Sequence, residues 1–170
     1  MSQFQFRKLS RSLFEPKKEG RLLELAAKDI AAQVEDVPHR PNPERAARLP
    51  PEAQTVYWLW HFFKEAQLGG MEVFILEPLG EYAPQIHAAL VNVGATELVR
   101  RLEAAIPLAR EGPAEFTTLP DQSWFEQFQP VRDFPTLQSI DQGIFPVIQS
   151  VTDTAGAFIR SNENTLFEPE

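Results

Sequence analysis

The segment that most constrains the fold runs from Glu52 to Leu68 and is apolar on nearly every side. Its apolar side chains are Val56, Tyr57, Trp58, Leu59, Trp60, Phe62 and Phe63. A helix without a polar face is buried in the middle of a bundle, because each of its sides needs an apolar neighbour. Gly69 and Gly70 follow, and glycine is typical of the left-handed end of a helix. The segment therefore predicts an all-α fold around one central helix.

Short helices are expected around this centre, because 15 prolines divide the chain of 170 residues and proline is costly inside a helix. Apolar residues at helical spacing predict helices over 21–36, 84–93, 97–106 and 152–162. Pro43 is expected to begin a short helix that runs to Leu49, and residues 136–148 form another short apolar segment. The runs 71–76 and 121–128 are also interpreted as helical. We expect Asn42 and Thr96 to cap two of these helices. No strand-like alternation of apolar and polar residues argues for a sheet.

The length predicts one helical domain, which we place at residues 21–170, preceded by a basic and flexible arm at residues 1–20. There is no cysteine, which excludes disulfides, thiolate metal sites and thiol catalysis. No apolar run approaches the ~18 residues of a membrane span, and the first residues lack the apolar stretch of a signal peptide. These observations predict a cytoplasmic protein.

Negative charge increases along the chain, whose net charge is -8. Residues 1–21 have a net charge of +4 and residues 22–110 of -4, whereas residues 111–170 hold ten acidic and two basic side chains. Such a charge repels nucleic acid and attracts a basic protein. The carboxylates that we expect to bind this partner are Glu111, Glu115, Asp121, Glu126, Asp133, Asp141 and Asp153.

Few residues form a pattern that could catalyse a reaction. His61 lies four residues before Glu65 and so shares a helical face with it, and the addition of His87 would give a two-histidine, one-carboxylate metal site. The alternative is a His61 that packs in the core. Nucleophile and phosphate-loop motifs are missing from the sequence, and we expect the neighbouring carboxylates Glu35 and Asp36 to be solvated. The sequence favours a protein without a cofactor and without enzymatic activity.

The arm combines Phe4, Phe6 and Phe14 with five basic residues. The positive charges and the phenylalanine rings of the arm could bind a nucleic acid through its phosphates and by stacking on its bases. Chain ends, however, are more often mobile or docked on a protein surface. A mobile segment, or one that docks on an acidic surface of the same chain or of a partner, is the alternative that we favour, and we expect no direct contact with nucleic acid.

The run from Leu68 to Glu77, followed by Gly80 to Ala83, resembles the centre of a bacterial domain family best known for a DNA-mimic protein. Residues 89–95 are similar to the family's next pair of helices, and residues 140–167 are similar to its C-terminal end, so the resemblance covers about residues 52–168. The family residues that are kept are those that shape turns and core: Gly69, Gly70, Phe74, Gly80, Tyr82 and Gly94. Several of the family's polar positions are replaced, for example by Leu68 and Val73.

The resemblance implies a mainly helical domain that binds a protein. In the characterised member of the family, an acidic dimer occupies the DNA-binding face of a transcription factor. For this chain, the resemblance implies a basic DNA-binding partner and an ability to form a homodimer. Two other hypotheses stay open: an immunity or antitoxin-like protein that neutralises a basic toxin, and a metal-dependent enzyme built on His61, Glu65 and His87.

Overall fold

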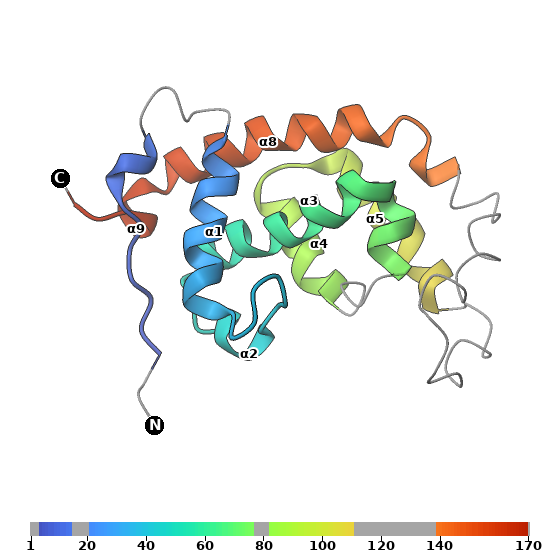
Figure 1. Cartoon of the computed structure of the whole chain (residues 1–170). Helices are drawn as coiled ribbons and strands as arrows, with labels where there is room; N and C mark the ends of the chain where they lie inside the picture. The colour runs from blue at the N-terminus through green and yellow to red at the C-terminus, as the bar shows by residue number, and fades with distance from the viewer. Residues whose placement is uncertain (1–3, 15–20, 77–81, 111–138, 170) are drawn as a thin grey trace.

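The computed structural model describes residues 4–14, 21–76, 82–110 and 139–169, of which 13–14, 72–76 and 106–110 are described by their backbone alone. Helices dominate these ranges (Figure 1), and the β pairing within them is one isolated bridge between Leu9 and Phe167. The helices are η1 (Arg11–Phe14), α1 (Leu22–Val34), α2 (Pro43–Ala46), α3 (Pro51–Leu76), α4 (Ala83–Asn92), α5 (Thr96–Arg110), α8 (Ile144–Ser161) and α9 (Glu163–Leu166). The predicted all-α fold is confirmed.

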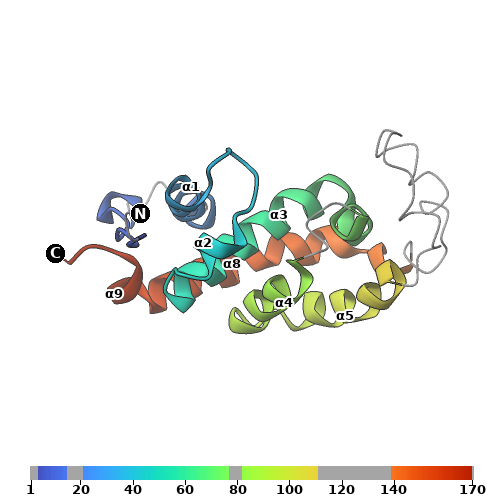
Figure 2. The same ribbon diagram turned by 90° about the horizontal axis from the view of Figure 1, so that it is seen from below.

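Helix α3 lies at the centre of the molecule and contacts α1, α4, α5 and α8. Figure 2 shows α8 running along one side of α3 while α4 and α5 lie on another. Val56, Tyr57, Leu59 and Phe62 are fully buried in the core that these helices share. The prediction of a central helix over residues 52–68 is therefore confirmed, and its apolar character follows from having neighbours on several sides.

Several predicted boundaries differ from the structure; α2, for example, ends at Ala46 and not at Leu49. Residues 144–161 form one helix, α8, where the sequence predicts two segments separated near residue 150. Pro146 does not prevent this, because it is the third residue of α8 and a helix leaves the N–H groups of its first turn without intrahelical partners. Helix α5 also continues through Pro107 to Arg110.

The two predicted helix caps have different outcomes. The Asn42 side chain accepts a hydrogen bond from the Arg45 N–H at 3.1 Å, which confirms it as the cap of α2. Thr96 is instead the first residue of α5, and the carbonyl of Ala95 accepts the bond from the Val99 N–H. The predicted helix over 121–128 lies outside the described residues. No helix within the described ranges combines the length and the apolar character needed to cross a membrane.

Candidate functional site

The glycine pair of the motif forms a sharp kink within α3. Gly69 has φ -161° and ψ 24°, and Gly70 has φ 74° and ψ -155°. The Gly70 conformation is one that essentially only glycine adopts, because a Cβ would collide with the backbone. The helix predicted over 71–76 begins directly after the kink. The double glycine therefore turns the chain between two helical segments, as the sequence predicts.

Asp141 closes this kink from the far end of the sequence. The Met71 N–H donates to Asp141 Oδ1 at 2.7 Å, so the carboxylate caps the helical turn that follows Gly70. A Cβ placed on Gly70 would lie 2.7–2.8 Å from three atoms of the same carboxylate. Gly70 and Asp141 thus fit each other, although 70 residues separate them in the sequence.

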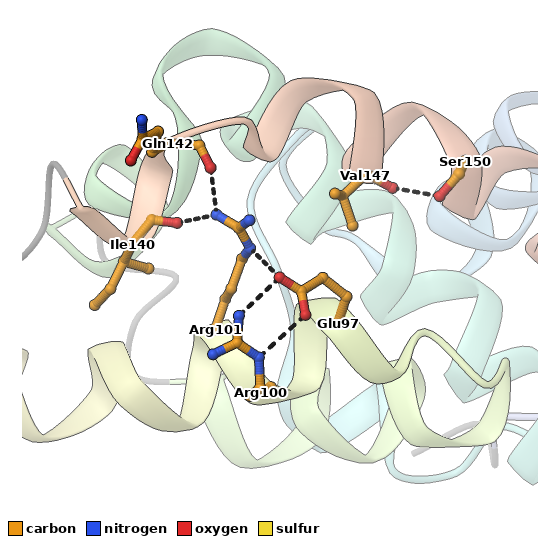
Figure 3. A network of polar contacts seen from close by, with 7 residues as sticks. All are labelled: Glu97, Arg100, Arg101, Ile140, Gln142, Val147 and Ser150. Carbon is orange, nitrogen blue, oxygen red and sulfur yellow. Dashed lines mark hydrogen bonds and ion pairs between the residues drawn. The ribbon is translucent and has the colours of Figure 1, made fainter.

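A third residue, Arg101 on α5, holds the turn that carries Asp141 (Figure 3). Its guanidinium donates to the backbone carbonyls of Ile140 and Gln142, the latter at 2.9 Å, and its Nε donates to Glu97 at 2.8 Å. Hydrogen bonds from Arg100 and Arg101 lower the pKa of Glu97 to about 2. Sequence reasoning missed Arg101, because its two backbone acceptors lie about 40 residues away and leave no sequence pattern.

The other described motif residues shape turns and packing. The Tyr82 ring lies 5.1 Å from the Trp58 ring, centre to centre, just before α4 begins. Gly94 has φ 73° after α4, and the Ala95 N–H closes the turn by donating to the Leu90 carbonyl. The Phe74 side chain and Gly80 lie outside the described residues.

A second polar site is buried where α1 ends. Glu35, whose side chain is 6% exposed, bonds to His61 Nε2 at 2.8 Å through one oxygen. Its other oxygen accepts the backbone N–H of His39 at 2.7 Å. The Tyr57 ring packs edge-on against His61, with ring centres 4.7 Å apart. The expectation that Glu35 is solvated is therefore wrong: it faces the core and joins the end of α1 to α3.

Burial controls the titration of both groups in this pair. It lowers the pKa of His61 to about 4, and the positive charges of Lys64 and His39 act in the same direction. It also raises the pKa of Glu35. The imidazole is therefore neutral at pH 7, and its Nε2–H donates to the carboxylate.

We expect His61 to make the protein sensitive to mild acid. Between pH 6.5 and pH 4, the histidine of the unfolded protein gains a proton that the folded protein excludes. The free energy of unfolding therefore decreases as the pH is lowered, by up to about 3 kcal/mol. The raised pKa of Glu35 has the opposite effect on stability, because the folded protein binds the Glu35 proton at a higher pH than the unfolded protein does. Urea unfolding of the wild type and of His61→Gln, compared from pH 7 to pH 4, isolates the histidine. A difference between the two proteins that does not change with pH would contradict this assignment.

The metal site imagined from the sequence is not formed. His61 Nε2 is engaged by Glu35, and His87 Nε2 lies 2.9 Å from Glu103 on α5. The described residues contain no cluster of three or more His, Asp or Glu side chains that could hold a metal ion. His61 is a core residue, as in the alternative interpretation, and the metal site on His61, Glu65 and His87 is not formed, because the two histidines are bonded to two different glutamates, Glu35 and Glu103.

The predicted partner-binding carboxylates have different positions in the structure. Asp153 is exposed on α8 and forms no ion pair with another described residue. Asp141 is half-buried and caps Met71, so its carboxylate is already used within the chain. The other five lie outside the described residues: Glu111, Glu115, Asp121, Glu126 and Asp133.

Acidic and basic side chains nearly balance in the described part of the chain. It holds 13 Asp or Glu side chains and 12 Lys or Arg side chains, which leaves 11 acidic and 4 basic residues for the rest. Many of the described charges are paired with each other: Arg21 and Lys28 with Glu24, Arg7 with Asp29, Arg11 with Glu163, Arg45 with Asp36, and Arg100 and Arg101 with Glu97. The uncompensated negative charge is thus concentrated in the remaining residues, five of which are the carboxylates named above.

The family comparison agrees with this structural reading of the motifs. Residues 47–162, more than half of the chain, match the family described as DMP19-like protein. No curated protein and no solved structure matches the chain. The match includes the glycine kink, the turn at Gly94 and the Asp141 cap. The chain therefore belongs to the DMP19-like protein family.

Proposed function

We propose that this protein is an acidic, non-enzymatic binding domain that acts in the cytoplasm and mimics DNA toward a basic DNA-binding protein. The observation that carries the proposal is the charge distribution: the cations of the described part are largely used in ion pairs, whereas residues 111–138 hold five acidic residues and one basic residue. Carboxylates at such a density can replace phosphates in the binding site of a basic protein. Membership of the family supports this choice.

The test is capture of a partner by the full chain from a lysate of the source cells, at 50 mM and 200 mM salt. We expect a basic DNA-binding protein at low salt, its release at high salt, and its displacement by duplex DNA, because both ligands would use one cationic face. Recovery of no basic protein at low salt, or of one that DNA fails to displace, would contradict DNA mimicry. A basic toxin as the captured protein would support the antitoxin-like alternative instead.

A pair of charge variants locates the binding residues. In the first, Glu115, Asp121 and Glu126 become Gln, Asn and Gln. In the second, Glu44, Glu52 and Glu65 become Gln, which changes the net charge equally at residues that form no ion pair with another described residue. We expect the first variant to bind the captured partner at least tenfold more weakly, since three contacts of about 0.5–1 kcal/mol each would be lost. Equal losses would mean that the partner senses only the net charge.

A further inference from the structure

The N-terminal arm is bound to the body of the protein as an extended peptide. Residues 4–10 lie beside α1 and α9, as both views show (Figure 1, Figure 2). The Leu9 N–H donates to the Leu166 carbonyl at 2.8 Å, and the Glu168 N–H donates to the Leu9 carbonyl at 3.0 Å. The arm thus forms a short parallel bridge with the chain that follows α9.

One side chain of the body recognises the backbone of the arm. The Arg7 N–H donates to Gln33 Oε1 at 2.8 Å, and Gln33 Nε2 donates to the Arg7 carbonyl at 3.1 Å. Gln33 therefore satisfies both backbone polar groups of one residue of the arm. Together with the bridge at Leu9, these hydrogen bonds hold the backbone of the arm against the body of the protein.

Apolar and basic side chains of the arm also have matching partners. Leu9 is fully buried, and Phe4 and Phe6 pack against the core. Arg7 pairs with Asp29 at 3.3 Å, and Arg11 pairs with Glu163 at 3.5 Å. The Lys8 ammonium donates to the Asn164 carbonyl at 2.6 Å. These are the contacts expected of a site for a basic peptide with an apolar anchor.

We propose that the surface formed by α1, α9 and residues 166–168, here called the arm site, is a binding site for extended basic segments of a partner protein. The chain's own arm occupies it and must leave before the partner segment binds. Charge complementarity selects the occupant, because Asp29, Glu163 and the exposed carbonyls of residues 164 and 168 all accept from cations. The ion pairs of the arm have exposed or half-exposed members and contribute little in water, so the buried Leu9 and the backbone hydrogen bonds are the contacts that a partner segment has to replace. The partner is of the class in the proposed function, but the arm site consists of other residues, so each proposal can fail without the other.

The test uses a fluorescent peptide with the sequence of residues 4–14 and the full chain carrying Leu9→Asp. The substitution places a carboxylate at a fully buried position, so the chain's own arm should leave the site. We expect this variant to bind the peptide at least tenfold more tightly than the wild type, in which the tethered arm competes at an effective concentration of about millimolar. A peptide that itself carries Leu9→Asp should bind neither protein.

Two matched changes in the Leu9→Asp background identify the site. Gln33→Ala should weaken peptide binding about tenfold, because two hydrogen bonds to the peptide backbone are lost, whereas Asp153→Asn on the exposed face of α8 should leave binding unchanged. If Leu9→Asp does not fold, Leu9→Ser is the second arm-releasing variant, since it removes the fully buried apolar anchor without burying a charge. A folded, arm-released protein that does not bind the peptide at millimolar concentration would overturn the proposal, as would equal binding by the wild type.

Discussion

Gly70→Ala is expected to lower the free energy of unfolding by about 3 kcal/mol. About 2 kcal/mol would come from forcing a side chain into the backbone conformation at φ 74°, ψ -155°. About 1 kcal/mol more would be lost because the new Cβ, 2.7 Å from the Asp141 carboxylate, displaces the cap of Met71. Urea unfolding at pH 7, followed by circular dichroism, measures the total.

Gly94→Ala is the comparison variant, because Gly94 also has a positive φ, 73°, but among the described residues no atom beyond its two chain neighbours lies within 4 Å of the place that its Cβ would take. It should cost only the left-handed strain, about 1–2 kcal/mol. A further comparison places Gly70→Ala in an Asp141→Ala background, where the close approach no longer exists and the substitution should cost about 1 kcal/mol less. Equal effects of Gly70→Ala and Gly94→Ala would show that the contact with Asp141 does not affect stability.

His61→Leu is expected to cost about 3 kcal/mol at pH 7. The leucine fills most of the volume but removes the donor that faces Glu35, so a carboxylate with a 6% exposed side chain loses a partner. The cost should decrease on acidification, because burial already raises the pKa of Glu35 and a protonated carboxyl needs no donor. Urea unfolding at pH 7 and pH 5 gives both values.

Two variants distinguish the lost hydrogen bond from lost packing. His61→Gln retains an amide donor for Glu35 and should cost only about 1 kcal/mol. Adding Glu35→Gln to His61→Leu removes the buried charge and should recover at least half of the loss, since a neutral buried amide is cheaper than an unpaired carboxylate. A double variant that is less stable than His61→Leu would contradict this explanation.

The elements that the sequence predicts well are those determined by local chemistry. The apolar character of segment 52–68 predicts a central position, and Gly69 and Gly70 predict a turn. The structure confirms both predictions, because the segment is buried and the two glycines form the kink. Asn42 caps α2 because its side chain and the following proline act over one turn. These features depend on neighbours a few residues away, which a sequence pattern displays.

The polar contacts that complete the fold could not be predicted in this way. Glu35 and His61 are 26 residues apart, and Arg101 binds carbonyls 39 and 41 residues away. Each pairing exists only because the helices pack in a particular order, and a lone glutamate or arginine in a sequence gives no sign of it. The same holds for Gln33, whose importance depends on an arm that lies beside it only in the folded chain.

The bridge between Leu9 and Phe167 also has a consequence for folding during synthesis on the ribosome. The arm emerges early, but its partners beyond α9 are translated more than 150 residues later. At about 5–20 residues per second, this delay amounts to roughly 8–30 seconds. During that time Leu9 has no C-terminal segment to pair with, so the arm completes its backbone contacts only after the last helix has been made.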